Sequence, residues 1–118
     1  MSAPVGPYSP VFRAGDWLVT SGQIGLRDGS LIGGGVREQA RQALANVRQL
    51  LEGQGASMSD VVKTTVFMVH IGDYGPLNEV YAEAFGEHRP ARSAVAVSAL
   101  PLGALVEIEV WARTVRQG

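Results

Sequence analysis

The residues best suited to chemistry lie near the end of the chain, where Arg92 precedes two carboxylates, Glu107 and Glu109. Two stretches here, 93–100 and 104–115, have strand-like alternation. Arg92 lies directly before the first, and the two glutamates lie within the second. Because side chains alternate across a strand, the two glutamates share one face of the second stretch. A guanidinium beside carboxylates on a sheet face can bind a small anion and activate a water molecule.

The Pro-Leu-Gly segment at 101–103 joins these two stretches and predicts a hairpin-like connection between two strands. The plainer interpretation of the charges is a half-solvated strand with its polar face toward water. Trp111 argues against it, because a large aromatic residue among the charges is unusual on a face that meets only water. The residues after Arg92 on its own face are also small: Ala94, Ala96 and Ser98.

Length and composition limit the class of protein. With 118 residues the chain forms a single domain, 1–118. Its net charge of −1 and its lack of a Lys/Arg cluster argue against nucleic-acid binding, and no apolar run is long enough to span a membrane. There is no cysteine for a disulfide, a thiolate nucleophile or a metal site. The first residues carry no export signal, so we expect a cytoplasmic protein.

Two segments have the periodicity of amphipathic helices. The first begins at Val36 and presents one apolar stripe: Val36, Ala40, Ala43, Leu44, Val47, Leu50 and Leu51. The glycines before it lack the spacing of a phosphate-binding loop, which favours a flexible connection. The second is capped by Asp73, carries Pro76 in its first turn and ends before Gly86.

Strands are predicted at 11–13, 17–24 and 61–69, and Gly22 interrupts the side-chain row of the second, so a ligand or another backbone can approach there. The third is rich in β-branched residues with apolar side chains on both faces, which predicts a central strand. The order predicts an α+β fold with a mixed sheet and, by right-handed crossovers, two helices on one face. The uncovered face must then carry Trp17 and Trp111 among its residues. This predicts a homo-oligomer in which sheets pack together and a cleft forms near Arg92 and Glu107 at a subunit boundary.

Seven short motifs give the chain a family resemblance. They are GPYS at 6–9, SGQI at 21–24, GGVREQ at 34–39, VKTTVF at 62–67, NEVY at 78–81, PARS at 90–93 and VEIE at 106–109. Together, in this order and over essentially the whole chain, they resemble the Rid family, also called the YjgF family, of enamine/imine deaminases. Each motif alone is weak evidence, whereas the set is specific.

The resemblance implies a chorismate-mutase-like fold and a homotrimer with its sheets packed inside and three clefts between subunits. It also implies hydrolysis of 2-imino acids, formed from enamines such as 2-aminoacrylate or 2-aminocrotonate, to 2-oxo acids and ammonia. By motif position, Arg92 would bind the substrate carboxylate and Glu107 would position the attacking water. The other residues implied at the cleft are Tyr8, Gly22, Ala94 and Asn78, with Gly22 and Ala94 acting through their backbones.

The implied chemistry suits these residue types. A guanidinium grips a carboxylate through two parallel hydrogen bonds, and a protonated imine is electrophilic enough to need no metal, cofactor or covalent nucleophile. A carboxylate in a partly dry cleft can orient water and carry its proton. Spacing alone does not distinguish Glu107 from Glu109 in this role.

Some positions depart from the family pattern, and other functions stay open. Ala94 stands where some members have Cys, Pro10 where Gln or Ala is frequent, and the 86–90 loop is short. His70 and His88 lack partners at metal-ligand spacing, and we interpret both as non-functional. The alternatives are a pathway-specific deaminase, and a non-enzymatic carboxylate-binding, chaperone-like or translation-inhibitor/ribonuclease member of the same family.

Overall fold

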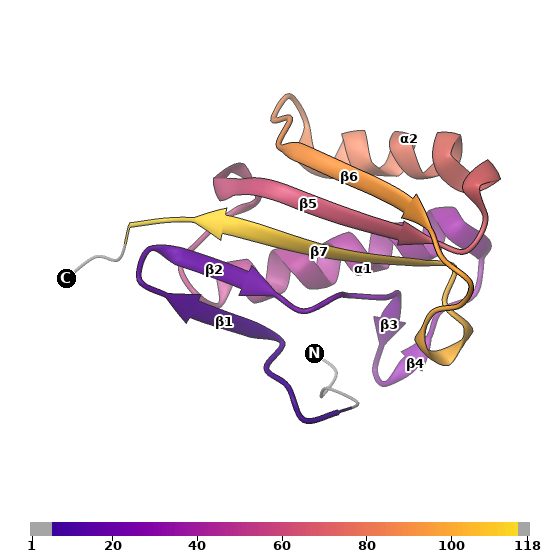
Figure 1. The fold of residues 1–118 in the computed structure, drawn as a ribbon, viewed down its shortest axis with the longest axis horizontal. Helices are drawn as coiled ribbons and strands as arrows, with labels where there is room; N and C mark the ends of the chain where they lie inside the picture. Colours follow the sequence, from indigo (N-terminus) through magenta and orange to yellow (C-terminus); the bar gives the residue numbers. More distant parts are fainter. Residues whose placement is uncertain (1–5, 116–118) are drawn as a thin grey trace.

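A computed structural model describes residues 6–115 of the chain (Figure 1). The strands are β1 (Val11–Ala14), β2 (Trp17–Thr20), β3 (Leu26–Arg27), β4 (Ser30–Leu31), β5 (Val61–Met68), β6 (Ala91–Ala96) and β7 (Val106–Arg113). The helices are α1 (Gly35–Glu52) and α2 (Tyr74–Phe85), with 3-10 turns η1 (Met58–Asp60), η2 (Ile71–Asp73) and η3 (Pro101–Gly103).

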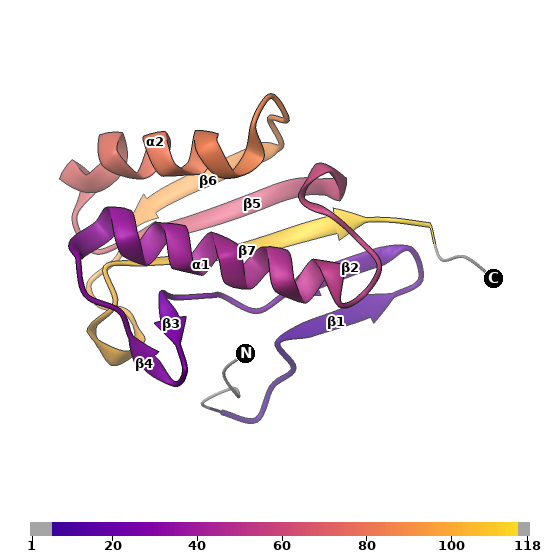
Figure 2. The ribbon, with the colours of Figure 1, turned by 180° about the vertical axis from the view of Figure 1, so that it is seen from behind.

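Five strands form one mixed sheet in the order β1-β2-β7-β5-β6. Only β5 and β6 run parallel; the other neighbours are antiparallel. Both helices lie on one face of this sheet, behind it in Figure 1 and in front of it in Figure 2. The predicted mixed sheet with two helices on one face is therefore confirmed.

The predicted hairpin between the last two strands is wrong. β5 lies between β6 and β7 and pairs with both of them. The connection crosses the end of β5, where the Val97 amide donates to the Met68 carbonyl and the Val69 amide donates to the Leu105 carbonyl. The β-branched residues of β5 predicted a central strand, and the structure confirms it, because β6 and β7 pair with its two edges.

The predicted strand over 17–24 is interrupted by a bulge. Val19 pairs with Trp111 and Gln23 with Ile108, so residues 20–22 face only residues 109 and 110 of β7. The Thr20 hydroxyl accepts the hydrogen bond of the Val110 amide at 3.1 Å, in place of a backbone carbonyl. The extra residue bends the strand near Gly22 and changes the direction in which its residues point, and bulges are often found beside functional sites.

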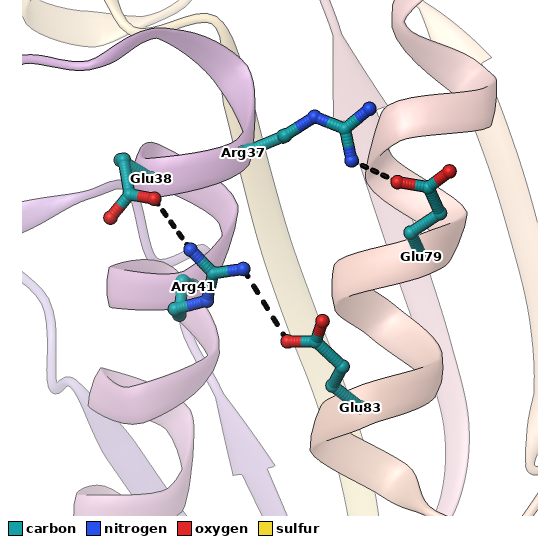
Figure 3. A network of polar contacts seen from close by, with 5 residues as sticks. All are labelled: Arg37, Glu38, Arg41, Glu79 and Glu83. Atoms are coloured by element: carbon teal, nitrogen blue, oxygen red, sulfur yellow. Dashed lines mark hydrogen bonds and ion pairs between the residues drawn. The ribbon is translucent and has the colours of Figure 1, made fainter.

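The hydrophobic core lies between the sheet and the helices. The inward residues of β7, which are Val106, Ile108, Val110 and Ala112, are all fully buried. Above this core, ion pairs of Arg37 with Glu79 and of Arg41 with Glu83 join α1 to α2, and Arg41 also pairs with Glu38 within α1 (Figure 3). These pairs are exposed, so packing of the apolar stripes stabilises the helix pair more than the charges do.

Among residues 6–115 no helix covers the other face of the sheet, which carries large apolar side chains. Trp17 is 39% exposed, Trp111 45% and Phe12 65%. The two tryptophan rings meet edge to face, with centroids 6.2 Å apart. The predicted apolar character of this uncovered face is confirmed.

Candidate active site

The outward face of β7 presents Glu107, Glu109, Trp111 and Arg113, as the alternation predicted. Glu107 and Glu109 are partly buried, whereas Trp111 and Arg113 are exposed. Both carboxylates therefore lie on the central strand of the uncovered face, and Trp111, which packs on Trp17, lies toward the C-terminal end of that strand.

Glu107 lies directly over Gly22. A Cβ atom at position 22 would lie 2.6 Å from Cδ and 2.8 Å from Cγ of Glu107, closer than real Cβ contacts allow. Glycine at the bulge therefore makes the space that the Glu107 side chain occupies. Within residues 6–115, neither the backbone of Gly22 nor the carboxylate of Glu107 is hydrogen-bonded, so both are available to a ligand.

The environment of Glu107 favours its protonated form. Burial raises the pKa of the Glu107 carboxyl, and the negative charge of Glu109, two residues along the same face, raises it further. A carboxylate with a raised pKa is a stronger base than an ordinary glutamate, which suits a group that takes a proton from water. This environment separates the two glutamates, which the sequence spacing did not.

Arg92 lies on the opposite face of the sheet, at its edge. It pairs with Thr64, whose buried hydroxyl is hydrogen-bonded to Tyr81 of α2 at 2.8 Å. The Arg92 guanidinium stacks over the Tyr81 ring at 4.7 Å and donates from Nη2 to the Tyr74 hydroxyl at 3.0 Å. Among residues 6–115 it forms no salt bridge, so its charge is not neutralised by a carboxylate of its own chain.

Asn78 lies on the same side of α2 as the two tyrosines that contact Arg92. Tyr74, Asn78 and Tyr81 follow one another at steps of four and three residues, which places them in one stripe of the helix. The Asn78 Oδ1 atom is buried and has no hydrogen-bond partner among the described residues. Sequence reasoning missed Tyr74 as part of this cluster, although its spacing from Asn78 was a signal for it.

A single chain does not bring Arg92 and Glu107 together. Glu107 pairs with Phe67, whose partner on β6 is Val95, three residues beyond Arg92. β6 and β7 are two strand spacings apart in the sheet, and Arg92 is displaced by three residues along β6. Together these offsets place the Cα atoms of Arg92 and Glu107 roughly 14 Å apart. Their side chains also point to opposite faces, so the expectation of a cation beside carboxylates on one sheet face is wrong within one chain.

The remaining residues of the predicted site divide between these two places. The amides of successive residues in a strand point to opposite edges. The Val97 amide donates to β5, so the amide of Ala94, three residues earlier, points to the free edge of β6, near Arg92. Gly22 lies with Glu107. Tyr8 is exposed in the segment before β1. The structure thus shows one cluster around Glu107 and another around Arg92.

The structure gives no support to a metal centre or a membrane segment in the part that it describes. No group of three or more potential metal ligands occurs among residues 6–115. In that range no helix is both long and apolar enough to cross a bilayer.

His88 is hydrogen-bonded through Nε2 to the Val61 carbonyl at 2.7 Å, which gives it a structural role, and His70 is exposed.

Comparison with known proteins points to one family. The profile of the family described as endoribonuclease L-PSP matches residues 1–114. The 2-iminobutanoate/2-iminopropanoate deaminase of Homo sapiens is 43% identical over 110 residues, covering 92% of this chain and 80% of that protein. A RutC family protein of Pyrococcus horikoshii is 46% identical over 111 residues, covering 92% and 88%. The structure of RidA from an Antarctic Psychrobacter is 39% identical, with a TM-score of 0.91 and coverage of 94% and 91%.

Proposed function

This chain belongs to the endoribonuclease L-PSP family, also called the Rid or YjgF family, and we propose that it hydrolyses reactive 2-imino acids to 2-oxo acids and ammonia. Relatives from mouse and human that are 44% and 43% identical are named 2-iminobutanoate/2-iminopropanoate deaminase. The substrates we propose are 2-iminopropionate and 2-iminobutyrate, formed from 2-aminoacrylate and 2-aminocrotonate.

The observation that carries this proposal is the state of Glu107. Its carboxylate is partly buried over Gly22 and forms no hydrogen bond within residues 6–115. Burial and the charge of Glu109 raise its pKa. An ion pair would hold such a carboxylate in the charged form, and Glu107 forms none with the residues that the structure describes. Glu107 is therefore suited to take a proton from water and to return it.

Arg92 supplies the binding group. Its guanidinium lacks a carboxylate partner within residues 6–115, and its in-plane N–H groups match the two oxygens of a substrate carboxylate. The Ala94 amide at the free edge of β6 is a further donor for the same anion. Asn78, with its buried and unpaired Oδ1, offers an acceptor to the substrate nitrogen.

We propose that the two clusters meet between subunits. The Arg92 cluster lies on the free edge strand β6, and the Glu107 cluster lies on the uncovered face with Trp17 and Trp111. A homotrimer in which the uncovered faces pack inside buries these tryptophans and can seat Arg92 of one chain opposite Glu107 of the next. Each trimer would then hold three equivalent clefts.

In such a cleft the reaction needs only these side chains and water. Glu107 takes a proton from water as the water oxygen bonds to C2 of the protonated imine, whose C=N electron pair moves to nitrogen. The protonated Glu107 then gives its proton to the amine. The C–N bond breaks, and Glu107 takes the hydroxyl proton and passes it to the departing ammonia. The products are a 2-oxo acid and ammonia, which leaves as ammonium, and Glu107 is again a carboxylate. Arg92 holds the carboxylate, which fixes C2 in place during these steps.

Two other functions compete with this one. The family's name suggests an endoribonuclease, but Arg37 and Arg41 on the helix face are paired with glutamates rather than free for phosphates (Figure 3). The net charge of −1 also disfavours RNA. A carboxylate-binding or chaperone-like protein without turnover would use Arg92 alone and would not need the raised pKa of Glu107.

The test is ammonia and 2-oxo acid release from imino acids generated in situ by an amino-acid oxidase. We expect the wild type to accelerate release, and Arg92→Ala and Glu107→Ala to abolish the acceleration. Wild-type protein at the uncatalysed rate would reject deamination, and binding of 2-oxobutyrate at Arg92 without turnover would favour the non-enzymatic alternative. Degradation of RNA that survives Glu107→Ala would favour a nuclease.

A further inference from the structure

The guanidinium of Arg92 is held by more than one group of α2. Its Cζ atom lies 4.7 Å from the centroid of the Tyr81 ring and 5.4 Å from that of Tyr74, and Nη2 donates to the Tyr74 hydroxyl at 3.0 Å. The side chain therefore has both a stacking partner and an in-plane partner, and both come from one helix.

The two contacts leave different parts of the cation free. Stacking on Tyr81 uses a face of the guanidinium and none of its N–H groups. The Tyr74 hydroxyl accepts one N–H of Nη2, and the other donors stay available for a planar anion. A long arginine side chain at a sheet edge has many rotamers, and the hydroxyl favours the one in which these donors share a fixed direction.

From this geometry we propose that Tyr74 is a positioning residue for carboxylate binding: its hydroxyl orients the Arg92 guanidinium before the substrate arrives. The inference rests on the proposed function of Arg92 as the carboxylate-binding residue and adds a residue to that site. Tyr74 lies at the first position of α2 and is 44% exposed, so its hydroxyl is near solvent and can be reached by a small anion.

The expected consequence concerns affinity rather than chemistry. Losing a preorganising hydrogen bond to a charged group weakens binding about three- to tenfold. Because Tyr74 is expected to act through Arg92 and not on the reacting atoms, kcat should stay within about twofold of wild type. The Tyr74→Phe variant tests this, since it removes the hydroxyl and keeps the ring that packs near Arg92.

The experiment combines binding and kinetics on the full chain. The dissociation constant of 2-oxobutyrate, a stable product with the same carboxylate, is measured by NMR titration for wild type, Tyr74→Phe, Arg92→Ala and the double variant. Imine deamination gives KM and kcat for the first two. We expect Tyr74→Phe to raise both the dissociation constant and KM, and to have no further effect when Arg92 is already alanine. Ile71→Ala, on the exposed turn before α2, serves as the control with wild-type values.

The outcomes separate this inference from the proposed function. Wild-type affinity in Tyr74→Phe, an equal loss in the Arg92→Ala background, or a fall in kcat without a change in KM would each overturn the positioning role. If the wild type binds 2-oxobutyrate through Arg92 and Tyr74 but does not deaminate, the proposed reaction fails and the positioning role stands. Absence of any 2-oxobutyrate binding by the wild type would overturn the positioning role together with the carboxylate-binding role of Arg92, whereas deamination itself is judged by the rate assay.

Discussion

The side chain of Glu107 lies directly on the backbone of Gly22, in the space that a Cβ atom would fill. The contact depends on the bulge that follows β2, which places Gly22 opposite β7 out of regular strand register. One glycine therefore decides whether the carboxylate that we propose as the general base can keep its position.

Replacing Gly22 tests this relationship. In Gly22→Ala the new methyl group would lie 2.6 Å from Cδ of Glu107, so the carboxylate must move. We expect kcat/KM for 2-iminobutyrate to fall about 10- to 100-fold, as misplacement of a reacting group does. Gly33→Ala is the matched control, because a Cβ atom there meets nothing within 4 Å. Equal activities of the two variants, both folded by circular dichroism, would contradict the role of Gly22.

The pH dependence of deamination should report Glu107. Its pKa is raised, so the active carboxylate form is lost as the pH falls, and it is lost at a higher pH than for an ordinary glutamate. Glu109→Gln removes a charge that raises this pKa, so the acid limb of kcat/KM should move to lower pH. Burial remains the larger cause, and the limb should stay above the ordinary range.

The measurement is a pH–rate profile corrected for uncatalysed hydrolysis. Glu52→Gln, at the end of α1 on the helix side, is the control and should leave the profile unchanged. A shift of the acid limb to higher pH in Glu109→Gln would show that the two carboxylates do not interact as their shared face predicts.

Mixing two inactive variants tests whether the cleft lies between subunits. Arg92 and Glu107 are on opposite faces of one chain, so Arg92→Ala and Glu107→Ala should complement each other in mixed oligomers. If each site takes one residue from each of two neighbours, random assortment restores about a quarter of wild-type activity. The variants are refolded together or co-expressed, and the activity is compared with that of separately prepared proteins combined at the assay. If oligomers verified to contain both variants regain no deamination activity, Arg92 and Glu107 of the same chain must serve the same site.

The uncovered face should be buried in the oligomer. Trp111 is 45% exposed and packs edge to face on Trp17, so Trp111→Glu would place a charge in an apolar contact between subunits. We expect light scattering to give three chains of 12.5 kDa for wild type and one chain for the variant, together with loss of deamination. Ile71→Glu changes an apolar residue that is 61% exposed but lies outside this face, and it should remain an oligomer. A monomeric wild type would reject the trimer.

The sequence by itself determined the main elements and the alternation of β7. The apolar stripes of both helices, the central character of β5 and the shared face of Glu107 and Glu109 depend on local periodicity, which is visible in the chain. The family resemblance also depended on sequence alone, and the match over residues 1–114 confirms it.

The tertiary structure decided what depends on partners distant in sequence. Proximity in sequence suggested that β6 and β7 pair, whereas β5, some 30 residues earlier, lies between them. That insertion separates Arg92 from Glu107, and the register, in which Arg92 and Val110 both pair with Thr64, places the two side chains on opposite faces. The bulge at Gly22, the raised pKa of Glu107 and the contact of Arg92 with Tyr74 likewise depend on which strand or helix packs alongside, and local periodicity carries no information on that.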